Sequence, residues 1–205
     1  MENHQEKTTK SKIVAGKQVK TYVHLFRAAN LALQNAEISK ENDFYSSMSC
    51  ILFCAFTLEA YLNHVGAIEF QYWGDDLESL NPKAKLRLIA GERIETTSNL
   101  EPKIFSPAKH PINISIDFSR RPFQSFTEIF RIRNDLAHGK TELLFDDYPH
   151  EPLTKWEKLC NLKQAKIFIQ DTEQMVSFLH SMLNPDTKQG NPFQPGMQFL
   201  GEVIE

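Results

Sequence analysis

The sequence NDFYSSMSCILFCAFTLEAYLNHVG, residues 42–66, predicts a long helix that is apolar on nearly every face. Asn42 and Asp43 are favoured N-cap residues, and Gly66 is typical of the position just after a helix. Such a helix belongs at the centre of a bundle, because a surface helix carries polar residues along one side. Its uncharged stretch, 44–58, is shorter than the roughly 20 apolar residues of a membrane span, so we expect no membrane contact.

Helical spacing of apolar residues recurs on both sides of this central helix. It predicts four further helices, at about residues 18–38, 81–94, 122–137 and 162–183. Two segments between them, residues 95–118 and 140–152, lack periodicity and predict long irregular loops; the first contains INISI, a stretch of extended character. The expected fold class is therefore all-α, a bundle of about five helices with no sheet.

The two ends of the chain are polar or rich in proline and glycine. We therefore expect a frayed N-terminus at residues 1–17, one helical domain at residues 18–184 and a loosely packed tail at residues 185–205. The length of 205 residues is sufficient for one domain with its own hydrophobic core.

Composition argues against several kinds of site. Three cysteines without a CxxC pair indicate a reducing, cytoplasmic setting. Neither GxxxxGK[ST] nor GxGxxG occurs, which argues against a phosphate-binding glycine loop. The histidines show no metal-ligand spacing, so we expect neither a metal nor another cofactor. A net charge of −3 argues against coating nucleic acid by bulk charge, but it leaves a local site open.

The predicted helix at 122–137 carries one charged residue on its apolar side. At about 100° per residue, Arg133 falls in the middle of that side, and Asn134 and His138 lie together on its border. A guanidinium that points at a core needs a partner, because it cannot lose its charge. Two interpretations fit this position: a structural arginine, paired in the core or reaching the rim, and a cation that lines an anion-binding cleft.

Glu59 is the only charged residue in the apolar run from Ile51 to Leu62. Our preferred hypothesis is that Glu59 contacts Arg133 and orients it. The alternative is a solvent-facing position near the end of the buried part of the helix. A separation of more than about 6 Å between the two side chains would exclude the first hypothesis, because charges that far apart no longer orient one another.

The run RNDLAH, from Arg133 to His138, resembles the Rx4-6H signature of HEPN domains. These are helical bundles whose active members are metal-independent ribonucleases. A polar residue follows the arginine in that signature, as Asn134 does here. FTLEAYLN, residues 56–63, is similar to the long core helix of the family, and the order of segments is similar from about residue 18 to residue 183.

This resemblance implies an endoribonuclease that cleaves RNA by attack of a 2′-OH, with Arg133, Asn134 and His138 as catalytic residues. It also implies a homodimer, because in the family two such sets of residues face one cleft. The expected substrate is single-stranded RNA or a tRNA loop. The expected role is that of a toxin or an antiviral defence effector, with a cognate antitoxin as a partner.

Four basic residues surround the motif: Arg120, Arg121, Arg131 and Lys140. They are expected to form an RNA-binding rim for backbone phosphates, or else a solvated charged face. Some proteins of the family keep the helices and serve only as binding or dimerisation modules. The alternative function is therefore a non-catalytic HEPN module that binds a nucleotide or a protein partner, and a purely structural helical dimer is the third.

Overall fold

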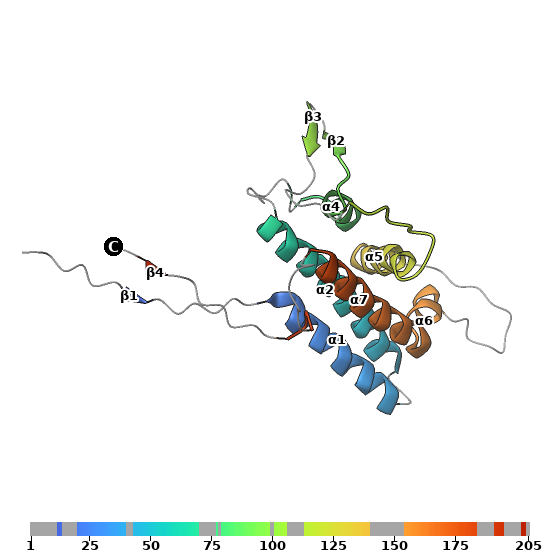
Figure 1. Cartoon of the computed structure of the whole chain (residues 1–205). Helices are drawn as coiled ribbons and strands as arrows, with labels where there is room; N and C mark the ends of the chain where they lie inside the picture. Colours follow the sequence, from blue (N-terminus) through green and yellow to red (C-terminus); the bar gives the residue numbers. More distant parts are fainter. Residues whose placement is uncertain are drawn as a thin grey trace, which may run out of the picture.

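The described part of the chain is mostly helical, which confirms the predicted all-α bundle (Figure 1). The computed structural model describes residues 12–13, 20–39, 43–69, 77, 79–98, 101–105, 113–139, 154–183, 191–194 and 202–203. The helices are α1 (Thr21–Ile38), α2 (Asp43–Glu69), α4 (Pro82–Ile89), α5 (Phe123–Ala137), α6 (Lys155–Leu159) and α7 (Leu162–Leu183). The strands are β1 (Lys12–Ile13), β2 (Ile94–Ser98), β3 (Glu101–Phe105) and β4 (Glu202–Val203).

Helix α2 is the centre of the bundle, and α1, α4, α5 and α7 each pack against it (Figure 1). Ile51, Leu58 and Leu62 of α2 are buried among these helices, and so are the free thiols of Cys50 and Cys54. The central position follows from the sequence, since a helix that is apolar on nearly every face removes most apolar surface from water when it has neighbours on several sides.

By length and composition, the segment of α2 from Asp43 to Ile68 is also long and apolar enough to cross a membrane. Half of its most apolar window is buried inside the bundle, and the core helix of any bundle passes the same test. This feature therefore does not decide whether the chain meets a membrane, and the expected absence of membrane contact stays a prediction.

Two predicted helix ends are wrong. Helix α2 does not end at Gly66 but continues to Glu69, and Gly66 is buried. Tertiary packing at this buried position outweighs the weak helix propensity of glycine. Helix α4 ends at Ile89, five residues before the predicted end, and Gly91 follows it with a φ of 102°. That left-handed conformation favours glycine and is common just after a helix.

The predicted irregular loop at 95–118 is wrong in its first part, because β2 and β3 form an antiparallel hairpin that begins with Ile94 opposite Phe105. Pro102 lies within β3 and weakens the sequence signal for a strand. Both strands of a two-stranded sheet are edge strands, where proline is tolerated. Residues 113–116 of the INISI stretch lie outside any strand.

Helix α6 adds a short element beyond the predicted five. Its N-terminus has a complete capping box, in which the side chains of Thr154 and Glu157 each accept a hydrogen bond from the backbone N–H of the other residue. The sequence TKWE, residues 154–157, contains the corresponding pattern of Thr followed three residues later by Glu. The predicted irregular segment at 140–152 lies outside the described residues.

The predicted loose tail at 185–205 is wrong at one place. Phe193 is only 8% exposed and belongs to the main hydrophobic core, so the packed region extends beyond residue 184. The described residues near the two ends also pair, since Lys12 lies opposite Val203 and Ile13 opposite Glu202. The other residues of the predicted frayed N-terminus, 1–17, lie outside the described residues.

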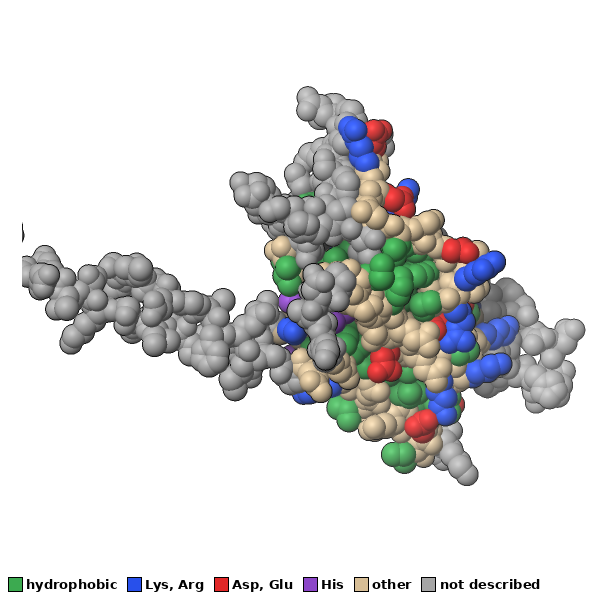
Figure 2. Space-filling model, in the orientation of Figure 1, with side chains coloured by type: hydrophobic (Ala, Val, Ile, Leu, Met, Phe, Trp, Pro, Cys, Tyr) green, Lys and Arg blue, Asp and Glu red, His purple; other side chains and the backbone are tan. Residues whose placement is uncertain are grey.

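Two histidines and a lysine interact at the end of the bundle where α1 begins and α7 ends; histidine and basic side chains gather there on the left of Figure 2. Burial lowers the pKa of His64, and the charges of Lys20 and His180 lower it further. Burial and Lys20 likewise lower the pKa of His180. The folded chain therefore favours the neutral form of both imidazoles.

These shifts predict that the free energy of unfolding falls as the pH is lowered from about 7.5 to about 5.5, a range that spans the ordinary histidine pKa of about 6.5. Below that value the unfolded chain binds protons that the folded chain does not bind, so acid favours unfolding. Urea unfolding at the two pH values measures the effect. His64→Gln is expected to reduce the pH dependence, because it removes one of the two histidines whose pKa the fold lowers.

Candidate functional site

The predicted contact between Glu59 and Arg133 is present. Glu59 lies in α2 and Arg133 lies in the last part of α5, and an Nη atom of Arg133 donates a hydrogen bond to Glu59 Oε2 over 3.0 Å. The side chains of Arg133 and Glu59 are 24% and 31% exposed, so the pair lies at the edge of the core. Arg133 therefore has the partner that a guanidinium at the edge of a core needs, a carboxylate that the bundle holds in place.

The guanidinium of Arg133 also lies 5.3 Å from the centre of the Phe130 ring, one turn earlier in α5. Its Nε–H is buried and has no hydrogen-bond partner among the described residues. An arginine has five N–H donors, and Glu59 accepts from one Nη. Arg133 is therefore positioned by a carboxylate and an aromatic ring, and its Nε–H is a buried donor without a partner among the described residues.

Asn134 and His138 are both exposed at the C-terminal end of α5. His138 is the C-cap residue, and its backbone N–H donates to Asn134 O over 3.0 Å. The two side chains are one turn apart and lie next to each other on the helix surface. In the described part of the chain, neither side chain makes a hydrogen bond or an ion pair. An imidazole and an amide are therefore accessible within five residues of the fixed guanidinium.

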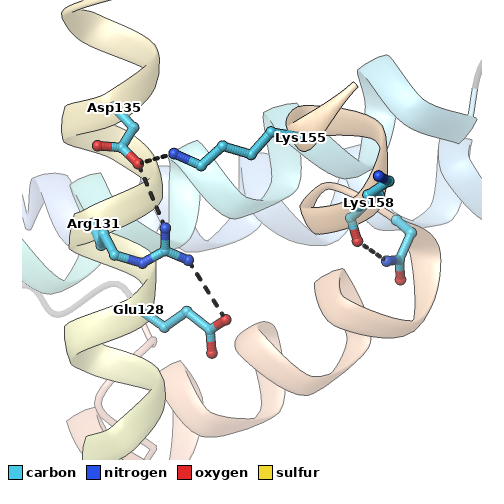
Figure 3. A network of polar contacts seen from close by, with 6 residues as sticks. Glu128, Arg131, Asp135, Lys155 and Lys158 are labelled. Carbon is cyan, nitrogen blue, oxygen red and sulfur yellow. Dashed lines mark hydrogen bonds and ion pairs between the residues drawn. The ribbon is translucent and has the colours of Figure 1, made fainter. Parts of the chain in front are cut away.

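The charges beside this helix end are balanced by one another (Figure 3). Asp135 accepts from Arg131 over 3.5 Å and from Lys155 of α6 over 2.9 Å, and Glu128 lies 3.9 Å from Arg131. Acidic side chains also lie between the Lys and Arg side chains at the right edge of Figure 2. The predicted rim at Arg131 is thus a mixed-charge network, and its link to α6 through Lys155 was not apparent from sequence.

Arg121, a residue of the predicted RNA-binding rim, has a structural partner, and its role in RNA binding stays a prediction. Its guanidinium makes a two-pronged ion pair with Asp171 of α7, with two N–O distances of 2.8 Å. Asp171 is fully buried and also accepts a hydrogen bond from the Ser125 hydroxyl. The hydrogen bond and the charge of Asp171 raise the pKa of Arg121. Arg121 therefore joins the start of α5 to the middle of α7.

The two remaining basic residues differ in what the structure says of them. Arg120 is 84% exposed, with one long contact of 3.4 Å to Asp117. It remains a surface cation, whereas Lys140 lies outside the described residues.

The sequence analysis did not identify Asp171 as a structural residue. It is the only charged residue on the buried side of α7, and the helical spacing that singled out Arg133 indicates it too.

The ion pair at the site leads to a prediction about stability. Glu59→Gln leaves the half-buried guanidinium without its counter-charge, so we expect a loss of about 1–2 kcal/mol in the free energy of unfolding. Glu128→Gln is the matched control, because that carboxylate lies 3.9 Å from a surface arginine and we expect a change below about 0.5 kcal/mol. Urea unfolding measures both. Equal effects in the two variants would mean that the Glu59 pair contributes no more than a surface contact.

Among the described residues, no group of three or more His, Cys, Asp or Glu side chains is arranged to hold a metal ion. The candidate site consists of Arg133 with its partner Glu59, together with Asn134 and His138.

Comparison with known proteins adds no relative: the chain matches no family model, no curated protein and no solved structure.

Proposed function

We propose that this chain is a metal-independent endoribonuclease of the HEPN type that acts as a homodimer on single-stranded RNA or a tRNA loop. The observation that carries the proposal is the arrangement at the end of α5, where a guanidinium fixed by Glu59 lies within five residues of an exposed amide and an exposed imidazole. The similarity of RNDLAH to the Rx4-6H signature supports the same assignment.

RNA cleavage without a metal needs a base for the 2′-OH proton, an acid for the leaving 5′-oxygen and fixed positive charge for the phosphorane. The 2′-oxygen bonds to phosphorus as the bond to the 5′-oxygen breaks, which leaves a 2′,3′-cyclic phosphate and a free 5′-hydroxyl. In this proposal His138 transfers the protons, and Arg133 binds the phosphate oxygens because its planar donors fit them. Asn134 orients the imidazole or donates to the phosphate.

One chain supplies one histidine at this site, whereas the reaction uses a base and an acid. A second copy supplies the other histidine in the proposed dimer. The exposed side of α2 supports this arrangement: Phe56 is 40% exposed, and Glu59 follows Phe56 by one turn. Large exposed apolar side chains next to a site are typical of a surface that meets another chain.

The experiment is incubation of the purified chain with RNA in EDTA, followed by analysis of the product ends. We expect cleavage that leaves 2′,3′-cyclic phosphates, and no cleavage of a substrate with 2′-deoxyribose at the cleaved position. Light scattering at micromolar concentration is expected to show a dimer. A monomer under these conditions, or the absence of cleavage on every RNA tested, would contradict the proposal.

The same proposal includes a biological role: the chain acts in the cytoplasm as a toxin or antiviral effector, and a cognate antitoxin inhibits it. Expression of the wild-type chain is then expected to slow growth, and Arg133→Ala is expected to relieve this effect. Growth inhibition that persists in Arg133→Ala would count against this role, because the guanidinium is the group proposed to stabilise the phosphorane.

One observation favours the alternative, a non-catalytic HEPN module that binds a nucleotide or a protein partner. Arg121 and Arg131 are matched by carboxylates, which reduces the positive charge available to an RNA backbone. The same incubation separates the two functions: binding of a nucleotide or a protein without cleavage of RNA would favour the module.

A further inference from the structure

A four-residue segment near the C-terminus, Asn191–Gln194, lies against the first turns of α1 (Figure 1). The Tyr22 hydroxyl donates a hydrogen bond to Pro192 O over 3.1 Å. The Phe193 ring stacks on Phe26 with the ring centres 4.0 Å apart, and its centre is 6.2 Å from that of the Tyr22 ring. Pro192 and Phe193 are both buried by this contact. The segment therefore docks through one aromatic ring and one hydrogen bond.

The segment has a local fold of its own. The Asn191 side chain accepts a hydrogen bond from the Phe193 N–H over 2.9 Å, and the Gln194 N–H donates to Asn191 O over 3.0 Å. This is a side-chain-stabilised turn, and Pro192 further restricts the backbone within it. The contacts that hold Phe193 in its docked orientation thus lie within four consecutive residues, as in a short peptide ligand whose shape is set before binding.

The surface that receives Phe193 consists of aromatic side chains of α1, backed by α2. Tyr22 is 1% exposed, and its ring packs against Tyr61 at 5.1 Å and His64 at 5.2 Å, both from α2. The only hydrogen bond of the Tyr22 hydroxyl among the described residues goes to the docked segment. A buried hydroxyl aimed at the docked backbone, with an aromatic wall beside it, has the features of a peptide-recognition pocket.

We propose that the pocket formed by Tyr22 and Phe26 is a peptide-binding site whose ligand is a segment that presents phenylalanine from an Asn-Pro turn. The chain's own Asn191–Gln194 fills the site as a detachable ligand, and the same segment of a second copy binds there when the chain's own is removed. The site lies apart from Arg133 and His138 and does not depend on RNA cleavage.

The probe is a fluorescent peptide of residues 188–197, KQGNPFQPGM, added to the full-length chain. In Phe193→Ala the pocket has lost its own ligand, so we expect saturable binding of the peptide. The wild-type chain is expected to bind the peptide about tenfold more weakly, because its own Asn191–Gln194 segment competes for the pocket. A tethered segment at an effective concentration of about 1 mM has that effect when the peptide Kd is near 100 µM. A peptide with alanine in place of its phenylalanine is expected not to bind.

Three further variants sharpen the test. Asn191→Ala keeps the phenylalanine but loses the turn acceptor, so its affinity for the peptide is expected to lie between those of the wild type and Phe193→Ala. Tyr22→Phe in the Phe193→Ala chain removes the hydroxyl donor and is expected to weaken binding several-fold. Phe199→Ala, another phenylalanine of the same tail, is the matched control and is expected to bind like the wild type.

Two results would overturn the proposal. The first is that Phe193→Ala and Asn191→Ala, folded by circular dichroism, bind the peptide no better than the wild type does. The second is that neither variant folds, because the segment would then be an integral part of the core and not a ligand of it.

Discussion

Replacing His138 by alanine is expected to reduce RNA cleavage by about 100- to 10,000-fold, the usual contribution of a general acid–base group. The imidazole is exposed at the C-cap of α5 and makes no hydrogen bond or ion pair among the described residues. Its removal is therefore expected to leave the free energy of unfolding within about 0.5 kcal/mol of the wild-type value. A large loss of activity without a loss of stability is the signature of a group that acts on the substrate.

The measurement is the rate of cleavage of one defined RNA in EDTA, with urea unfolding of the same preparations. His24→Ala is the matched control, because that histidine is exposed on α1 and lies outside the candidate site. An unchanged rate in His138→Ala would remove the histidine from the mechanism, and the cleavage would then be due to another group or to a contaminating nuclease. A loss of stability that parallels the loss of activity would assign His138 a structural role.

The contact between Glu59 and Arg133 was predictable because each residue is the single charge on an apolar helix face. Two opposite charges that both face the interior of one bundle are stabilised most when they meet. The central position of α2 and the bounds of α5 and α7 were predictable for a related reason, since long periodic segments carry many independent apolar positions. These elements fix the place of the candidate site.

Other features depend on contacts between residues far apart in the sequence. Arg121 precedes α5 and directly follows Arg120, and only the packing of α7 brings Asp171 to it. Phe193 lies in a proline- and glycine-rich tail without periodicity, and only the pocket beside Tyr22 shows why it is buried. The ion pair of Arg121 and the burial of Phe193 were therefore not predictable from the sequence.

Arg121→Ala is expected to lower the free energy of unfolding by about 3–5 kcal/mol, the cost of leaving a buried charge without its partner. Asp171 is 1% exposed, whereas the Arg121 side chain is 50% exposed. The cost is therefore asymmetric: Asp171→Ala frees an arginine that can turn to water, so we expect a smaller loss, of about 1–3 kcal/mol. The double variant is expected to lose less than the sum of the two single losses, because each single change already breaks the same pair.

Arg120→Ala provides the matched control at the adjacent position. Its side chain is 84% exposed and has one contact of 3.4 Å to Asp117, so we expect a change within about 0.5 kcal/mol. If Arg121 served RNA binding alone, Arg121→Ala would weaken RNA binding. It would leave urea unfolding unchanged, as the loss of a surface cation does. Because the pair joins α5 to α7, loss of Arg121 is expected to reduce RNA cleavage only in proportion to the fraction of chains that unfold. A loss of activity in fully folded Arg121→Ala would support the predicted role of this residue in RNA binding.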